Sequence, residues 1–435
     1  MLTLESLEVS INLAWVMLAT FLVFFMHAGF TMLEAGFVRS KNTINIIMKN
    51  FMTITVGSLI YYFVGFGIMF GDTAGGFIGT NGFLLNGRTD VDFFVFQAMF
   101  AATCATIISG AVAERIKLGS YIVIAIVMVA FVYPVIGHWV WNGGWLAELG
   151  FTDFAGSTVV HMTGAVGALI TVLFLGPRLG KYSGNKVNVI PAHNIPLGAL
   201  GVFFLWFGWF GFNGGSTLAS DPSLVPNVIA TTLLSTSAAF VSGLIFTKLR
   251  YGKVDATLSL NAVLGGLVGI TAGAADISPL GSVIVGLVSG VLLVIAVEII
   301  DAKLKVDDPV GAIAVHGVCG IWGTLAVGLF STSTGFFYTG SFSQLGVQAL
   351  GVLAVMLWIV VTMTIAVFIL NKISRIRISE KAELAGLDFI EHGSSAYELK
   401  ETLLEQGETG ALSAFSRTVG GHLADRLNQL SSKSV

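Results

Sequence analysis

Two histidines end the same nine-residue pattern, D-x-x-G-x-x-x-V-H, which runs once from Asp153 to His161 and again from Asp308 to His316. In each copy the histidine stands eight residues after the aspartate, at the start of an apolar stretch. Eight residues of helix rise about 12 Å, which is close to half of a ~30 Å membrane core. Because an ionisable side chain is costly at that depth, two placed symmetrically favour a polar pathway over a purely structural role.

The chemistry of such a pair follows from its surroundings. Burial disfavours the charged form of imidazole, so we expect His161 and His316 to be neutral and one ring to donate a hydrogen bond to the other. A neutral pair offers hydrogen bonds to a small polar molecule and little stabilisation to a cation. The pair therefore predicts a path for a neutral solute.

Trp141 and Asp153 lie ahead of the first histidine, on the side that we predict to be outer. An indole face binds an ammonium-like cation with ~1–2 kcal/mol when partly desolvated, and a carboxylate at the mouth would attract that cation. Each residue also has a structural interpretation, as an interfacial aromatic or as a helix N-cap. Pro309, directly after Asp308, favours the cap for that aspartate, whereas for Asp153 both roles stay open.

Composition identifies the elements that position these residues. Of 435 residues, 55% are hydrophobic and 11% charged, and the mean hydropathy is +0.86, too apolar for a soluble domain. Cys104 and Cys319 both fall inside apolar runs, which argues against a disulfide framework. We predict an all-α polytopic membrane protein with eleven transmembrane helices, at about 10–34, 45–70, 92–112, 118–138, 156–176, 196–214, 224–247, 258–274, 280–300, 310–331 and 345–371.

The distribution of basic residues predicts an orientation. The chain has 22 lysines and arginines. Only Arg88 lies in a loop on the side of the membrane where the N-terminus is predicted, and Lys49 lies just inside a span. All the others lie in loops on the opposite side or in the tail. Basic residues mark the cytoplasmic side. We therefore expect the N-terminus outside, the C-terminus inside, and a location in the cytoplasmic (inner) membrane.

The repeated pattern also predicts the internal organisation. Its two copies begin the fifth and tenth spans, so the unit is five helices, and an odd number of spans inverts the second unit. We expect an inverted 5+5 repeat in which the two histidines meet near the midplane. The predicted membrane domain is 1–375, with repeats at about 10–176 and 196–331 and a last helix at about 345–371, and a cytoplasmic tail follows at 376–435.

Other chemistries find little support in the sequence. A zinc site would need ligand spacing such as HExxH, and none is present. There is no nucleotide-binding loop either, so active pumping by ATP is not supported. We expect no cofactor, no nucleic-acid partner and no enzyme activity. Glu34 and Glu114 precede Arg39 and Arg115 at predicted inner helix ends, where an ion pair or a cap is the expected role.

Several longer motifs resemble those of the ammonium transporter (Amt/Mep/Rh) family over about 10–397. The matching stretches are GFTMLEAGFVRSKN at 29–42, FQAMFA at 96–101, GAVAERI at 110–116, DFAGSTVVH at 153–161, GWFGFNGGS at 208–216, GLVGIT at 266–271, DDPVGAIAVHGVCGIWG at 307–323 and GLDFIEHGSSAY at 386–397.

This resemblance implies a trimer in which each subunit has its own narrow pore. It implies an outer recruitment site formed by Trp141, Phe100 and Ser216, with Phe96 nearby and Asp153 in support. It further implies a gate of stacked Phe100 and Phe212, with the histidine pair below. Ammonium would be captured outside, give up its proton near the gate, and pass the histidines as ammonia.

Three positions depart from the family pattern as we know it. His27 stands where we expect glutamine, Ser157 where glycine is commoner, and Asn261 at a pore position where the bacterial transporters carry serine. None of these replaces a central group.

The segment after Tyr397 exceeds what an ordinary ammonium transporter tail needs. Apolar residues recur at helical spacing between 410 and 432, interrupted by Gly420 and Gly421. This pattern predicts either a helix on the cytoplasmic face or a linker to a signalling domain. A transporter would bind a regulator of the nitrogen-signalling PII type, whereas an ammonium sensor would conduct little and continue past Val435 into an output domain.

Overall fold

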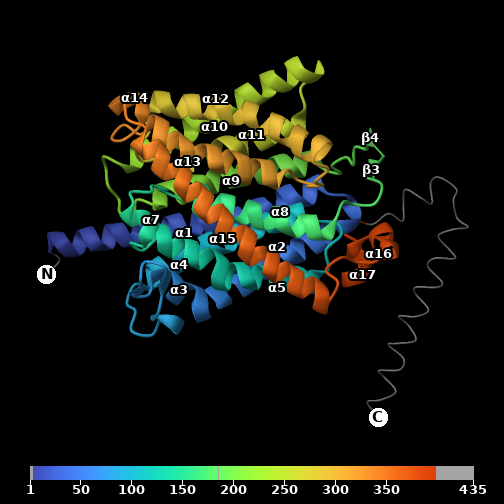
Figure 1. The fold of residues 1–435 in the computed structure, drawn as a ribbon, viewed down its shortest axis with the longest axis horizontal. Helices are drawn as coiled ribbons and strands as arrows, with labels where there is room; N and C mark the ends of the chain where they lie inside the picture. Colours follow the sequence, from blue (N-terminus) through green and yellow to red (C-terminus); the bar gives the residue numbers. More distant parts are fainter. Residues whose placement is uncertain (1–2, 185, 398–435) are drawn as a thin grey trace, which may run out of the picture. The chain divides into compact units, whose positions relative to one another are not determined.

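The computed structural model describes residues 3–184 and 186–397. Residues up to Gly393 form one compact unit, a bundle of roughly aligned helices (Figure 1). The helix predicted at 410–432 lies outside the described residues. The longer helices are α1 (Leu4–Phe37), α2 (Thr43–Ile60), α4 (Val91–Ala111), α5 (Leu118–Val127), α6 (Tyr133–Trp141), α8 (Thr163–Leu175), α9 (Ile195–Gly215), α10 (Val225–Tyr251), α11 (Ala256–Thr271), α12 (Pro279–Glu298), α13 (Cys319–Phe330) and α15 (Ser343–Ile373).

Short elements occupy the two ends of this bundle. One end carries β1 (Thr73–Ala74), β2 (Ile78–Gly79), α7 (Trp145–Glu148) and α14 (Phe336–Thr339), and we call it the outer end after the predicted orientation. The other, inner end carries β3 (Tyr182–Ser183), β4 (Lys186–Val187), α16 (Glu380–Ala385) and α17 (Leu387–His392). In Figure 1 the outer end is on the left and the inner end on the right. The remaining elements are α3 (Phe66–Phe70), η1 (Ser40–Asn42), η2 (Tyr61–Gly65), η3 (Phe83–Leu85), η4 (Met128–Val132), η5 (Ser157–Met162), η6 (Ile299–Lys303) and η7 (Ile313–Val318).

Within the described residues, ten continuous helical segments are long and apolar enough to cross a membrane, and each matches a predicted span. The span predicted at 258–274 corresponds to α11, which is apolar but has 16 residues. At 1.5 Å per residue it is about 24 Å long, less than a ~30 Å core. The predicted helical class is therefore confirmed, while the count of eleven depends on α11.

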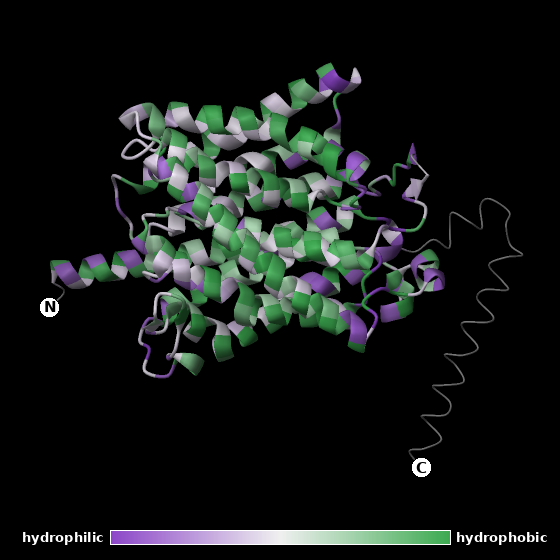
Figure 2. Ribbon diagram, in the orientation of Figure 1, coloured by the Kyte–Doolittle hydropathy of each residue, from purple (hydrophilic) through white to green (hydrophobic). Residues whose placement is uncertain are grey.

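The surface of the bundle is apolar between its ends. Figure 2 shows hydrophobic residues along the length of the helices and hydrophilic ones concentrated at the two ends. Large side chains such as Phe21, Phe203 and Leu357 are more than half exposed. A water-soluble surface would not carry such a continuous apolar band, so lipid or other subunits must cover it.

Glycine permits close contact between helices α1 and α9. A Cβ atom added to Gly36 would lie 2.5 Å from the backbone nitrogen of Gly198, and one added to Gly201 would lie 2.4 Å from that of Leu33. Larger residues would therefore push the helices apart. Small residues that allow such close backbone approach are typical of membrane helix interfaces.

Buried ion pairs join the inner ends of the helices. Glu114 pairs with Arg39 and also with Arg178, at 2.7 Å, and Arg178 pairs with Asp307 at 2.8 Å. The expected ion pair is thus found for Glu114. Glu34 is different, because its carboxylate accepts hydrogen bonds from Ser109 and Asn50, and Arg39 pairs with Glu114 instead.

The described part of the predicted tail folds back onto the inner end. The backbone N–H of Lys117 donates to Ile376, and that of Ile378 donates to Arg115. The Asp388 carboxylate accepts the N–H of Asn45 at the start of α2, 2.9 Å away. Residues 376–392 are therefore packed as part of the compact unit, and the domain boundary at 375 stays a prediction.

The Arg178–Asp307 pair gives a pH-dependent prediction. Burial raises the pKa of Asp307, but the hydrogen bonds and charges of Arg178 and Arg115 outweigh burial and bring that pKa from 3.8 down to about 2. A depressed carboxyl pKa stabilises the fold above pH ~4, and this contribution is lost as the pH falls toward 2. Asp307→Asn should lower stability at pH 7 by roughly 2–5 kcal/mol, because a buried arginine loses its partner.

Thermal unfolding in detergent between pH 7 and pH 2.5 measures this effect. The difference between the variant and the parent protein should shrink below pH 4, since protonated Asp307 resembles asparagine. A matched control is Asp92→Asn in the first turn of α4, which forms no ion pair in the described structure. A difference that stays constant across the pH range would contradict the assignment.

Candidate functional site

The two copies of the repeated pattern have the same local construction. Gly156 and Gly311 have positive φ angles of 109° and 80°, a region where only glycine is unstrained. The Asp153 carboxylate accepts the backbone N–H groups of residues 156–159, and that of Asp308 accepts those of residues 310, 311 and 313. Each aspartate thus caps a helix that begins with a π-helical turn, η5 or η7. Each π-helical turn carries one of the histidines.

These turns bring His161 and His316 together. Their Nδ1 atoms are 3.2 Å apart, and their rings lie 5.2 Å apart at an interplanar angle of 21°. The rings are 0% and 4% exposed. One Nδ1 must donate and the other accept, because two donors or two acceptors would repel each other. The predicted contact between the two rings is present.

An aromatic column leads from the histidines to the outer end. Trp209 stacks on His161 at 4.9 Å, and the Phe212 ring is 5.3 Å from His161. Phe100 stacks on Phe212 at 4.1 Å, with 26° between the planes. Phe100 and Phe212 are at most 1% exposed, so the two rings separate His161 from the outer pocket.

The outer pocket has a volume of about 150 Å³. Phe96, Phe100, Trp141 and Ser216 all line it, as expected. The Ser216 hydroxyl donates to the carbonyl of Phe212 at 2.8 Å, which leaves its oxygen lone pairs as acceptors. A pocket of aromatic rings and oxygen acceptors suits a small cation that carries N–H donors.

Asp153 is close to this pocket but does not line it. Its carboxylate is turned into the helix start, and the residue is 3% exposed. Its backbone carbonyl accepts the indole N–H of Trp141 at 2.7 Å. This geometry favours the N-cap among the two roles considered, and it fixes the Trp141 ring at the pocket wall.

Sequence reasoning missed Gln97, a residue of the FQAMFA motif that also lines the pocket. The side chain is 7% exposed, and its Oε1 atom is buried with no hydrogen-bond partner within the described structure. A buried amide oxygen without a donor is costly. The useful signal was a polar residue one position after Phe96 on an otherwise apolar helix.

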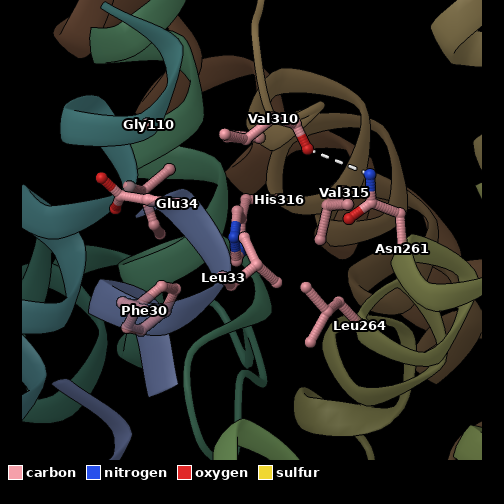
Figure 3. Close-up of a pocket in the computed structure, with 11 residues that line it drawn as sticks. Phe30, Leu33, Glu34, Gly110, Asn261, Leu264, Val310, Val315 and His316 are labelled. Carbon is pink, nitrogen blue, oxygen red and sulfur yellow. Dashed lines mark hydrogen bonds between the residues drawn. The ribbon is translucent and has the colours of Figure 1, made fainter. Parts of the chain in front are cut away.

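A second, smaller cavity lies on the inner side of the histidine pair. It has a volume of about 20 Å³, enough for one water molecule. Figure 3 shows Phe30 and Glu34 on one side of His316 and Asn261 on the other. Asn261 donates to the carbonyl of Val310 at 3.0 Å, and its buried Oδ1 has no partner in the part of the chain that the structure describes.

The other two departures from the family pattern differ in kind. The Ser157 hydroxyl accepts a hydrogen bond from the N–H of Ala272 and donates one to the carbonyl of Val268. It therefore provides hydrogen-bond partners for backbone groups at the C-terminal end of α11. His27 is 5% exposed, and both ring nitrogens are buried. It lines an apolar pocket between α1 and α2, away from the histidine pair. Within the described ranges no cluster of three or more His, Cys, Asp or Glu could hold a metal ion.

Comparison with known proteins agrees with this site. The sequence profile of the Ammonium Transporter Family matches residues 14–397. The chain is 41% identical over 420 residues to Ammonium transporter Amt2 of Archaeoglobus fulgidus, covering 90% of this chain and 89% of that protein. This protein belongs to the ammonium transporter family, and it is a multi-pass membrane protein.

Solved structures extend the comparison. A structure described as a sensor Amt protein is 42% identical, with a TM-score of 0.87 over 89% of this chain and 100% of that one. The crystal structure of Candida albicans Mep2 is 30% identical, with a TM-score of 0.79 over 86% of this chain and 87% of that one. The chain therefore resembles both a sensor and a transporter.

The unpartnered amide of Gln97 gives a testable prediction. Gln97→Leu keeps the approximate volume but removes the acceptor, and a hydrogen bond to a charged group contributes ~1.5–3 kcal/mol. We expect the ammonium concentration that gives half-maximal binding or current to rise about tenfold. Tryptophan fluorescence or current titration in proteoliposomes measures the change.

Gln344→Leu is the matched control, since Gln344 lies on α15 and does not line the pocket. It should leave the titration unchanged. An unchanged titration in Gln97→Leu as well would remove Gln97 from the site.

Proposed function

We propose that the protein moves ammonium nitrogen across the membrane as ammonia. Trp141, Phe96, Phe100, Ser216 and Gln97 capture ammonium in the outer pocket. The ion loses its proton at the Phe100–Phe212 stack, and ammonia passes the histidine pair. The observation that carries this proposal is the single column formed by the outer pocket, the two stacked phenyl rings and the two imidazoles.

The cost of desolvation supports deprotonation at the gate formed by Phe100 and Phe212. A cation that leaves water for an apolar passage loses hydration worth many kcal/mol, whereas a neutral polar molecule loses far less. The stacked rings of Phe100 and Phe212 exclude water from this passage, and the imidazoles beyond them offer hydrogen bonds without a counter-charge. Both features favour ammonia over ammonium.

The assembly that we propose follows the family. Eleven helices including α11 span the membrane as an inverted 5+5 repeat, with the N-terminus outside and the C-terminus inside. Three copies form a homotrimer in the cytoplasmic membrane, with one pathway per subunit. The matching caps and π-helical turns at Asp153 and Asp308 support the repeat, and the apolar band supports contact with lipid and neighbouring subunits.

A second candidate is an ammonium sensor. The similarity to a sensor Amt protein, at 42% identity, favours it. A sensor would bind ammonium in the same outer pocket, conduct little, and act through its tail on a cytoplasmic output domain. A transporter would instead be regulated at its inner end by a partner such as a PII-type protein. Transport with the intact chain distinguishes the two candidates.

The histidine pair is the place to test transport. In proteoliposomes, isotope-labelled ammonium added outside should enter faster with the parent protein than without protein, and the His161→Ala, His316→Ala double variant should reduce this protein-dependent uptake at least tenfold, because the hydrogen bonds inside the apolar passage are lost. His392→Ala, on α17 at the inner end, is the matched control and should keep its uptake.

Uptake in the double variant equal to that of the parent would count against the pair. Ammonium binding without uptake in the parent protein would favour the sensor.

A further inference from the structure

We propose that Glu34 is the proton acceptor at the inner end of the pathway and returns the proton to ammonia there. This assignment rests on the proposed transport function and adds a residue to it. The observation behind it is a buried carboxylate that shares the inner cavity with His316 and forms no ion pair in the described structure.

The position of Glu34 follows from helix α1. Phe30 and Glu34 are four residues apart, so they lie on one face, about 6 Å apart along the axis. The Phe30 ring is 6.2 Å from that of His316, and Figure 3 shows both α1 side chains beside His316. Glu34 is therefore the next polar group inward from the histidine pair on this helix face.

The hydrogen bonds of Glu34 leave one oxygen free. Oε2 accepts from the Ser109 hydroxyl at 2.7 Å and from the Asn50 amide at 3.2 Å. Oε1 has no hydrogen bond to any described residue, although the whole residue is only 2% exposed. A carboxylate oxygen without a donor can accept a proton or bind N–H groups.

The nearby charges do not lock Glu34 into one state. Lys49 is fully buried close by, but its ammonium donates to the backbone carbonyl of Ser109 at 2.8 Å and lies outside ion-pair distance of the carboxylate. Asp308 contributes a second negative charge from the start of η7. The positive and the negative neighbour act in opposite directions, which suits a group that gains and loses a proton in each cycle.

The inner cavity provides the contact between Glu34 and the pathway. Its volume of about 20 Å³ holds one molecule the size of water or ammonia. Gly110 also lines it, and a Cβ atom there would lie 3.5 Å from the Glu34 carboxyl carbon and 2.5 Å from Val310. The unpartnered Oδ1 of Asn261 provides another acceptor for N–H or O–H donors.

The proton step is balanced over one cycle. Ammonium releases a proton at the outer gate and becomes ammonia, and the proton moves by way of the histidine pair to the Glu34 carboxylate, which becomes a carboxylic acid. Ammonia then takes that proton in the inner cavity and leaves as ammonium, which restores the carboxylate. One positive charge crosses for each nitrogen.

The test separates charge movement from ammonia movement. Proteoliposomes that contain a pH dye report ammonia entry as internal alkalinisation, while a supported membrane reports current. Glu34→Gln should reduce the current at least tenfold and increase internal alkalinisation above that of the parent protein, because ammonia then enters without a proton, and Glu34→Asp should restore part of the current. Glu8→Gln, at the exposed outer end of α1, is the control and should change neither signal.

Other outcomes overturn the assignment. Unchanged current in Glu34→Gln would exclude Glu34 as proton acceptor, and a loss of current with no gain in alkalinisation would indicate a structural role. If Glu34→Gln does not fold, Ser109→Ala keeps the carboxylate but removes a hydrogen bond to it, and it should shift the pH dependence of the current; an unshifted profile would also overturn the proposal. A parent protein with neither signal would refute the transport function itself, which is a different result.

Discussion

A helix that begins in the interior of a membrane protein has no water to accept hydrogen bonds from its first backbone N–H groups, so the protein itself must provide the acceptors. Asp153 and Asp308 meet this need, each with three or four backbone N–H groups on one carboxylate. Each cap holds a glycine with positive φ, and the following π-helical turn carries a histidine. The two capped helix starts therefore position the two imidazoles against each other.

The caps also explain how much of the site could be predicted. The nine-residue repeat contains the cap, the glycine and the histidine, so the pairing of His161 with His316 was available from spacing alone. The role of Asp153 could not be predicted from spacing, because a carboxylate at a membrane surface can attract a cation or cap a helix. Only the structure shows that the Asp153 carboxylate accepts hydrogen bonds from four backbone N–H groups of the turn.

Other parts of the site had no sequence pattern that could reveal them. Gln97 and Glu34 sit singly on apolar helices. The Gln97 amide oxygen has no hydrogen-bond partner in the described structure, and both hydrogen bonds to the Glu34 carboxylate reach Oε2. In the sequence, Arg39 is only five residues from Glu34 and was a candidate for an ion pair with it. In the structure Arg39 pairs with Glu114 instead, because three inner helix ends converge there. Long-range convergence of this kind leaves no periodic signal. The helices themselves were predictable to within a few residues because membrane thickness fixes their length.

The two halves of the pathway differ although their helix starts match. Trp141 stands twelve residues before Asp153, and the corresponding residue before Asp308 is Ala296. The outer half thus contains an aromatic pocket and two stacked phenyl rings, whereas the inner half contains a small cavity with a carboxylate and a carboxamide. An aromatic pocket binds a cation from water, and a carboxyl group that has taken up a proton can return it to ammonia beyond the apolar passage. The repeated scaffold therefore provides the central hydrogen bond, and the residues that break the repeat make the outer and inner halves chemically different.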